Sequence, residues 1–466
     1  MTVIRYNATG CGPTPIHGLI EDGFASMPFW VMMVITALWV VMPASTGASY
    51  SDEGAVNLLR NRATPLHGAS DLDPLVAAIG DRRLVLLGES SHGTSEFYIW
   101  RTQISRRLIQ EQGFRFIAVE GDWDSSYRLN RYVKGATAQG DSARSVMQGF
   151  SRWPTWMWAN EEMVDLIEWL RSHNDNRAAA EQVGFYGLDL YGQSGSLRKV
   201  PEMLAQMAPV LSERAVEAYA CLAPYGDDFS LYAQAAARGQ LSCESSVRAV
   251  VAMLRQERPL AARDPDAYFN LKQHALVVKH AEGHYRAMAI SGPQSWNVRA
   301  DHFFLTTERL LTHYGEGAKG IVWAHNTHIG DARATAMVMR GQRNIGQIAR
   351  ERLGDRAVYA VGFGTHRGTV MAGSRWGAPA EVMTVPPAMP GSFEDLSHRT
   401  QMARFLLSFD DPAGFEPLTD PVGHRAIGVV YQPARERPGN YVPSVMPRRY
   451  DAFIFLDQTQ AVHPVE

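Results

Sequence analysis

Short apolar runs alternate with helix-like periodicities along most of the chain from about residue 80 onward. A helical pattern such as that of Ser95–Gln112 places its apolar residues on one face. Strands that alternate with helices predict an α/β fold, with a mostly parallel central sheet covered by helices on both faces. The apolar runs, which we interpret as strands, are Leu84–Leu87, Phe116–Val119, Val183–Leu188, Ile321–Trp323 and Val358–Val361.

The long segment between the third and fourth of these runs carries almost no strand signal. It contains four helical patterns, at Pro201–Leu222, Glu244–Glu257, Ala267–Ala289 and Trp296–Tyr314. Proline suits a first helical position, and Pro209 is expected to break the first pattern. We therefore expect a helical insertion or cap over residues 195–318, inside one catalytic domain that spans residues 51–466. Late strands are expected at Ala426–Tyr431 and Ala452–Leu456.

Residues 1–50 form a separate N-terminal appendage. Phe29–Met42 carries no charge, but a bilayer-spanning helix needs about 20 apolar residues, so no stable membrane span is expected. The length fits a secretory signal, whereas Glu21 and Asp22 before it, with Arg5 as the one basic residue, do not. We expect a cytoplasmic protein. Export through this segment and a start site assigned too far upstream are the alternatives.

The composition excludes several classes of protein. With 45% hydrophobic residues the chain can form a core, which a disordered protein cannot. The net charge of −3 does not indicate a nucleic-acid partner. Cys11, Cys221 and Cys243 are far apart and form no C-x-x-C motif. They predict neither a disulfide framework nor a zinc site.

Ionisable residues collect where the predicted strands end. In open α/β sheets, ligands bind at this carboxyl edge. One histidine after a strand is usually a loop residue, and one glutamate can merely stabilise a helix N-terminus. Several clusters at one edge instead predict a functional site. They are Glu89 with His92, Glu120 with Asp122, Asp189, His325 with His328, and His366.

The usual hydrolase signatures are absent. Gly88–His92 lacks the final glycine of a G-x-S-x-G elbow, and the chain has no H-E-x-x-H and no P-loop. The remaining chemistry is that of carboxylates with imidazoles, in which a neutral imidazole takes a proton from water. The spacings Glu89-x-x-His92 and His325-x-x-His328 also suit a metal, so a metal-bound water is an alternative.

Several of these motifs, taken in order, resemble those of the erythromycin esterase family. The resemblance covers roughly residues 65–460, and the pairing of G-E-x-x-H-G with A-H-N-x-H makes it specific. The matching segments are Leu87–Phe97 (LGESSHGTSEF), Ala118–Trp123 (AVEGDW), Tyr186–Tyr191 (YGLDLY), Trp323–His328 (WAHNTH), Asn344–Gln347 and Tyr450–Ala452.

The resemblance implies hydrolysis of a carboxylic ester, and in the best-known members of a macrolide antibiotic's lactone, without a required metal or other cofactor. Carried over to this chain, it makes His92 the general base that activates water. Glu89 and Glu120 would orient that base and the water. His325 would bind the substrate carbonyl or stabilise its oxyanion.

The resemblance also implies a substrate-binding set. His328, like His325, would bind the substrate carbonyl or stabilise its oxyanion. Arg101 would contribute positive charge at the site. Asp189 and Tyr191 lie at another strand end and are further candidates. The expected partner is a small-molecule ester or lactone.

Four alternatives remain open from the sequence. The same residues could serve a metal-dependent hydrolase, or the chain could be a non-catalytic protein of surface-polysaccharide biosynthesis. Arg101 could be an exposed helix residue. The aromatic-rich stretch Phe150–Trp158 could line an apolar pocket, although we favour core packing for it.

Overall fold

The computed structural model describes residues 52–239, 242–290 and 292–465. The predicted appendage, including its apolar segment Phe29–Met42, lies outside these residues. Within the described ranges, no helix combines the length and apolarity needed to cross a membrane.

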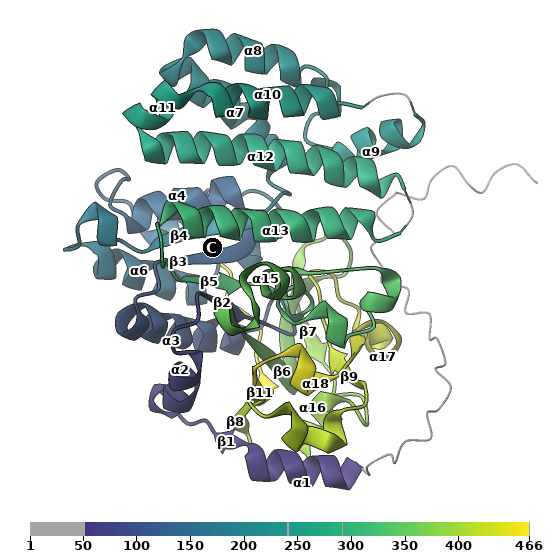
Figure 1. Ribbon diagram of the computed structural model, residues 1–466. Coiled ribbons are helices and arrows are strands. Elements are labelled where there is room, and N and C mark those ends of the chain that lie inside the picture. Colours follow the sequence, from purple (N-terminus) through teal and green to yellow (C-terminus); the bar gives the residue numbers. More distant parts are fainter. Residues whose placement is uncertain (1–51, 240–241, 291, 466) are drawn as a thin grey trace, which may run out of the picture. The chain divides into compact units, whose positions relative to one another are not determined.

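A mostly parallel sheet forms the centre of the fold (Figure 1). From β11 through β6, β2, β5 and β3 to β4, all neighbouring strands are parallel, whereas β1, β8 and β7 pair antiparallel at the margins. This arrangement confirms the predicted α/β class. In sheet order the strands are β1 (Thr64–Pro65), β8 (Arg404–Ser408), β11 (Ala452–Thr459), β6 (Val358–Gly373), β2 (Leu84–Leu87), β5 (Gly320–Trp323), β3 (Phe116–Asp122) and β4 (Gly184–Asp189), with β7 (Ala380–Val385) on β6.

Alternate residues of the central strands face two separate hydrophobic cores. On β2, Val85 and Leu87 belong to one core, and Leu84 and Leu86 to the other. This explains why the strand is an uninterrupted apolar run, as expected for a sheet buried on both faces. Helices that cover the first face are α2 (Asp73–Ile79), α3 (Ser95–Gln112), α5 (Ala143–Gln148) and α6 (Glu161–Asn174). Those that cover the second include α1 (Asp52–Arg62), α13 (Gln294–His313), α15 (Ile345–Leu353) and α16 (Phe393–His398). The helix α4 (Trp123–Val133) contributes residues to both cores.

The helical insertion lies between β4 and β5, as predicted, and has a core of its own. Its long α12 packs against α7, α10 and α13 (Figure 1). The break at Pro209 is confirmed, but the helix before it begins at Gln193 and contains Pro201 in its interior. The insertion comprises α7 (Gln193–Met207), α8 (Pro209–Tyr219), α9 (Phe229–Ala237), α10 (Glu244–Gln256), α11 (Arg258–Arg263), α12 (Pro265–Met288) and α13.

The prediction that the cysteines form no disulfide is wrong for one pair. Cys221 and Cys243 are joined in the insertion, with their Cα atoms 5.8 Å apart. That distance lies within the normal range for disulfides. The packing of the helices on either side of the intervening segment produces it, and the spacing of cysteines along the chain carries no sign of such packing.

The C-terminal part differs from the expected strands in two ways. β6 continues for 16 residues, so His366 lies in its interior rather than after its end. The expected strand at Ala426–Tyr431 is reduced to isolated bridges at Ile427 and Val430. Short elements complete this part, namely α14 (Asn326–Ile329), β9 (Val422–Arg425) paired with β10 (Tyr441–Ser444), α17 (Glu436–Gly439) and α18 (Met446–Arg449).

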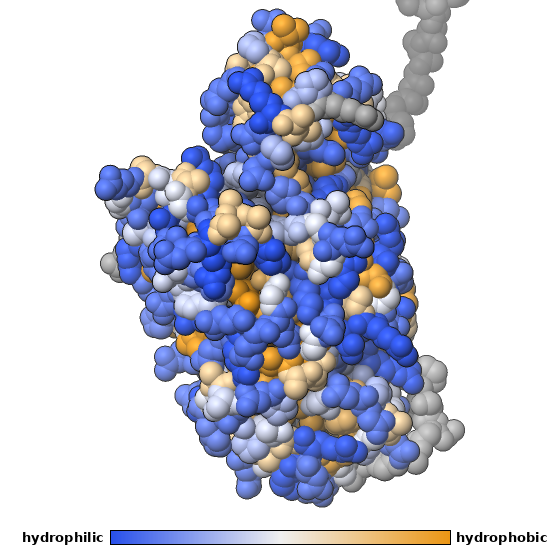
Figure 2. Space-filling view, turned by 60° about the vertical axis from the view of Figure 1, so that its left-hand side comes forward, coloured by the Kyte–Doolittle hydropathy of each residue, from blue (hydrophilic) through white to orange (hydrophobic). Residues whose placement is uncertain are grey.

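Hydrophilic residues predominate on the face drawn in Figure 2, and hydrophobic residues form small scattered patches on it. Large exposed aliphatic side chains of the insertion include Val210 and Val216 on α8 and Leu231 on α9. Single exposed aliphatic residues are normal on soluble proteins.

Candidate active site

The loop after β2 is held so closely that two of its residues must be glycine. A Cβ atom on Gly88 would lie 2.1 Å from Oδ1 of Asn326, and one on Gly93 would lie 2.0 Å from the carbonyl oxygen of Met371. Both distances are far shorter than a van der Waals contact. The loop that carries Glu89 and His92 therefore packs closely between α14, which follows β5, and the distal half of β6.

Glu89 links a histidine to a buried arginine. Its Oε1 accepts a hydrogen bond from Nδ1 of His92 at 2.8 Å, and its Oε2 pairs with Nη2 of Arg101 at 2.7 Å. Arg101 is fully buried, and its guanidinium lies over the rings of Tyr98 and Trp323. The alternative that Arg101 is an exposed helix residue is therefore wrong. The structure places it behind Glu89.

Glu120, at the end of β3, connects three parts of the chain. Its Oε2 accepts from the backbone N–H of His325 at 2.9 Å. Its Oε1 accepts from Nη2 of Arg299 at 2.8 Å and lies 3.2 Å from Nε2 of His328. These contacts fix the loop after β5 against β3, so Glu120 orients His325 and His328 rather than contacting His92.

Arg299 on α13 was missed by the sequence reasoning. Besides Glu120, its guanidinium donates to Asp189 at 2.6 and 3.1 Å, and its Nη1 lies 3.0 Å from Nε2 of His328. One signal was available. Trp296, Arg299 and Phe303 recur at helical spacing on one face of α13, and an arginine within such an apolar stripe needs a buried partner.

The imidazoles of His92 and His325 lie side by side, with ring centroids 4.9 Å apart. Nδ1 of His325 accepts from the backbone N–H of Thr327 at 3.3 Å and lies 2.8 Å from its hydroxyl. The proton of neutral His325 therefore sits on Nε2. That nitrogen is buried and makes no hydrogen bond of normal geometry within the described part of the chain, while the backbone of Ser90 lies close enough to the ring to raise its pKa.

The electrostatics separate the two neighbouring histidines. Burial alone would lower the pKa of His92, but Glu120 and Glu89 outweigh it, so the pKa lies above the usual 6.5. Burial, together with the adjacent His92, holds the pKa of His325 well below its usual value. Burial would raise the pKa of Glu120, yet the neighbouring histidines and Arg299 hold it well below normal. His92 and His325 therefore form a pair in which the imidazole of His92 is readily protonated and that of His325 is neutral.

His328 lies at the same edge of the sheet as Glu120 and His325. It is buried, and its ring stacks on Trp296 with centroids 4.6 Å apart. Burial lowers its pKa below the usual value. Its Nε2 lies 3.0 Å from Nη1 of Arg299, which can only donate, and 3.2 Å from Oε1 of Glu120, which can only accept. Within the described residues Nδ1 has no hydrogen-bond partner.

Asp189 and Tyr191, the two weaker candidates, lie beside Arg299. Burial would raise the pKa of Asp189, but Arg299 outweighs it and the pKa is lowered. The ring of Tyr191 faces the guanidinium of Arg299 at 4.9 Å and that of Arg152 at 5.3 Å. Asp122 pairs with Arg152 at 3.3 Å.

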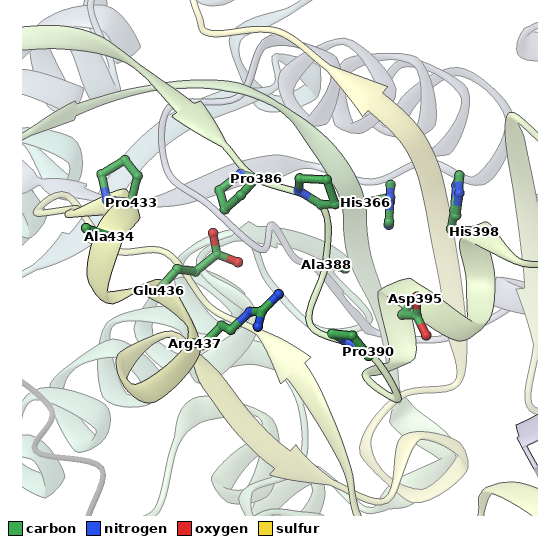
Figure 3. A pocket seen from close by; sticks show the side chains of 11 residues that line it. His366, Pro386, Ala388, Pro390, Asp395, His398, Pro433, Ala434, Glu436 and Arg437 are labelled. Atoms are coloured by element: carbon green, nitrogen blue, oxygen red, sulfur yellow. The ribbon is translucent and has the colours of Figure 1, made fainter.

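His366 does not join this group, so its expected place beside the other strand-end residues is wrong. Its ring stacks on that of His398, with centroids 3.8 Å apart, and lines a separate cavity of about 570 Å³ (Figure 3). The physical reason is the length of β6, which continues past His366 because β11 and β7 pair along it.

The aromatic-rich stretch Phe150–Trp158 packs mainly in the core and contacts the backbone of the site residues. Trp156 and Trp158 are buried in the first core, as favoured from the sequence. Nε1 of Trp158 donates to the carbonyl oxygen of Glu120 at 2.9 Å. The hydroxyl of Tyr98 joins this stretch to the loop after β2, because it lies 2.7 Å from the carbonyl oxygens of both His92 and Met157.

The donor set does not resemble a preformed metal centre. In residues 52–239, 242–290 and 292–465, no three His, Cys, Asp or Glu side chains are arranged to hold a metal ion. The carboxylates of Glu89 and Glu120 are instead engaged by arginine and histidine.

A family model described as Erythromycin esterase matches residues 109–459. The chain belongs to the erythromycin esterase family. It is 32% identical over 126 residues to erythromycin esterase type II of Escherichia coli, a match that spans only 28% of that protein. It is also 18% identical over 453 residues to the protein named "Putative hydrolase YbfO" of Bacillus subtilis (strain 168). That match covers 91% of this chain and 96% of the relative. The family and these names support a hydrolase.

Solved structures share the fold along nearly the whole chain. A crystal structure titled as a succinoglycan biosynthesis protein has a TM-score of 0.73 at 22% identity and covers 90% of this chain and 100% of its own. An erythromycin esterase mutant in its open conformation has a TM-score of 0.65 at 16% identity and covers 87% of this chain and 99% of its own. At these identities the likeness establishes the fold alone.

Proposed function

We propose that this family member hydrolyses a carboxylic ester or lactone with water activated by His92. The observation that carries the proposal is the 2.8 Å hydrogen bond between Glu89 and Nδ1 of His92. This bond fixes the proton on Nδ1 and leaves Nε2 as the basic nitrogen. The side chain of His92 keeps 9% of its surface exposed, so water can reach it. A raised pKa strengthens it as a base.

Arg101 acts as a positioning residue in this proposal. Its guanidinium is fully buried and pairs with Oε2 of Glu89, so it holds the carboxylate in place and leaves Oε1 for His92. It does not bind the substrate itself. This differs from the substrate-binding role that the family resemblance implies for the same arginine.

His325 and His328 supply hydrogen-bond donors for the oxyanion. The lowered pKa values keep both imidazoles neutral near pH 7. His325 then presents a buried N–H on Nε2, and the buried Nδ1 of His328, which has no partner in the described residues, offers a second donor when it carries the proton. Donors of this kind stabilise the negative charge that develops on a carbonyl oxygen, and each contributes a few kcal/mol.

The reaction then proceeds in two steps. The oxygen of water forms a bond to the acyl carbon while Nε2 of His92 takes the proton, and the carbonyl oxygen becomes an oxyanion. When the carbon–oxygen ester bond breaks, His92 returns that proton to the departing alkoxide. Glu89 and Glu120 stabilise the imidazolium between these steps, because both raise the pKa of His92.

A screen against 4-nitrophenyl esters and macrocyclic lactones tests the proposal. We expect hydrolysis by the wild type that survives dialysis against a chelator, and loss of it in His92→Ala. The matched control is His67→Ala, because His67 is exposed and lies outside the site. Loss of activity on chelation, restored by Zn²⁺ or Mn²⁺, would favour the metal-dependent alternative. A wild type that cleaves none of these compounds would favour the non-catalytic alternative.

A further inference from the structure

The exposure of the polar side chains around Glu120 and Asp189 increases toward Arg152. The side chains of Glu120 and Asp189 are 5% and 6% exposed, and those of Asp122 and Arg299 are 10% and 11% exposed. Arg152, in the loop after α5, is 33% exposed. Exposure therefore increases from the buried carboxylates toward Arg152, which places this arginine at the solvent side of the cluster.

Arg152 is joined to the catalytic group through one aromatic ring. Its guanidinium lies 5.3 Å from the ring centroid of Tyr191, and that of Arg299 lies 4.9 Å from the same centroid. Arg299 in turn contacts Glu120. Arg152 is therefore linked to the catalytic residues through Tyr191, Arg299 and Glu120.

The two arginines differ in how many of their donors are used. Arg299 makes short contacts to Glu120, Asp189 and His328. Within the described residues, Arg152 makes a single ion pair, at 3.3 Å to Asp122, and no hydrogen bond. A guanidinium carries five N–H donors in a planar fork. Arg152 thus holds unused donors in the geometry that matches a carboxylate.

Aromatic packing holds the Arg152 loop in place. Nε1 of the adjacent Trp153 donates to the carbonyl oxygen of Ala378 at 2.8 Å. Its ring lies 4.7 Å from that of Trp376, which in turn lies 6.3 Å from Tyr191. The loop is thereby anchored to the turn between β6 and β7. An arginine on an anchored loop loses less entropy when it binds a ligand than one on a free loop.

We infer that Arg152 determines specificity by binding a carboxylate carried by the substrate away from its scissile ester. The inference rests on the proposed function and narrows the substrate class to anionic esters. A neutral substrate gains nothing from the unused donors.

Three sets of esters test this inference. The mono-4-nitrophenyl ester of adipic acid is compared with 4-nitrophenyl hexanoate, and 3-carboxy-4-nitrophenyl hexanoate places the charge on the alcohol side instead. A hexanoate with a terminal trimethylammonium group provides the opposite charge. We expect kcat/KM of the wild type to favour one of the two anionic esters over the neutral one by about 10- to 100-fold, the usual range for a hydrogen-bonded ion pair.

Substitutions of Arg152 test whether this residue causes the preference for an anionic ester. Arg152→Gln should remove the preference while kcat/KM for the neutral ester stays near the wild-type value. Arg152→Lys should retain part of it. Arg198→Gln is the matched control, because Arg198 is also exposed and also makes one ion pair, to Asp227 at 3.0 Å. Circular dichroism checks that each variant is folded. Equal cleavage of anionic and neutral esters, or an equal loss for all esters in Arg152→Gln, would overturn the inference.

A binding measurement separates this inference from the hydrolytic proposal. Calorimetry compares the mono-4-nitroanilide of adipic acid with hexanoic acid 4-nitroanilide, since amides resist cleavage. Tighter binding of the anionic anilide, lost in Arg152→Gln, supports an anion subsite even if no ester is cleaved. In that case the hydrolytic proposal fails and the subsite survives. Equal binding of both anilides counts against the subsite.

Discussion

Glu120 and Arg299 lie 2.8 Å apart although 179 positions separate them in the sequence. One ends a central strand and the other lies on the last helix of the insertion. Their ion pair therefore attaches the insertion to the catalytic edge of the sheet. The same guanidinium also pairs with Asp189, so one side chain bridges two buried carboxylates.

Arg299→Ala should impair both stability and catalysis. It leaves Glu120 and Asp189 buried without their cation, and breaking a buried pair costs about 3–5 kcal/mol. We expect the free energy of unfolding to fall by a similar amount, as measured by urea denaturation, together with a loss of kcat. Arg299→Lys should recover part of the stability, but not the geometry of the planar fork.

The control for that experiment is Arg198→Ala. Its ion pair with Asp227 is exposed on both sides, and exposed pairs contribute about 0–1 kcal/mol. Equal destabilisation by Arg198→Ala and Arg299→Ala would contradict the importance assigned to the buried pair.

His92 and His325 should act as a unit. His92→Ala removes proton transfer, and general acid–base groups contribute about 10²–10⁴-fold in rate. His325→Ala removes a donor that meets charge only in the transition state, so both losses should appear in kcat rather than KM. The double variant should then lose less than the product of the two single losses. Steady-state kinetics on any cleaved ester, with circular dichroism, provides the data.

A folded His92→Ala variant that retains the wild-type kcat would show that His92 is not the base. Strict multiplication of the two single effects would instead show that the two imidazoles act independently, despite their ring contact.

The pH profile should depend on Glu89. Because the pKa of His92 is raised, kcat/KM should increase with pH through a midpoint above 6.5, as the base loses its proton. Glu89→Gln removes a negative charge that stabilises the imidazolium. The midpoint should then move to lower pH, because the hydrogen bond and charge of Glu89 raise the pKa of His92. Glu111→Gln, which alters an exposed carboxylate at the other end of α3, should leave it in place. A midpoint unchanged in Glu89→Gln would contradict the assigned pair.

The strand-end residues were predictable because their positions follow from local pattern. An apolar run identifies a strand, and parallel strands bring their carboxyl ends to one edge. Glu89, His92, Glu120, His325 and His328 accordingly lie together. Their catalytic roles do not follow from that placement and remain a proposal.

The features that were missed depend on tertiary packing. Arg299 reaches the site only because the insertion docks on the second face of the sheet, and the disulfide of Cys221 forms only because helices bring Cys243 near. His366 was misplaced because pairing with β11 and β7 prolongs β6 through a glycine-containing segment. The disulfide and the length of β6 have no signal in local periodicity, and for Arg299 only the apolar stripe on α13 indicated a buried partner.

Buried histidines between α12 and α13 should make the protein sensitive to acid. His284 is buried and donates from Nδ1 to the carbonyl oxygen of Ser295 at 2.9 Å. Burial lowers its pKa to about 4, and that of His280, which contacts His302, to about 3. In the unfolded chain these histidines bind protons near pH 6.5, whereas in the folded protein they bind protons only at lower pH. Stability from these groups is therefore present above about pH 6.5 and is lost as the pH falls toward 4.

Each such histidine contributes a slope of about 1.4 kcal/mol per pH unit between its two pKa values. His284→Gln keeps an N–H donor for Ser295 but cannot be protonated. Urea denaturation from pH 7 to pH 4.5 should therefore show a free energy of unfolding that falls less steeply for this variant, by about that amount per unit. His67→Gln, at an exposed position, should follow the wild-type curve. If His284→Gln and the wild type lose stability in parallel across this range, acid sensitivity does not arise from this buried imidazole.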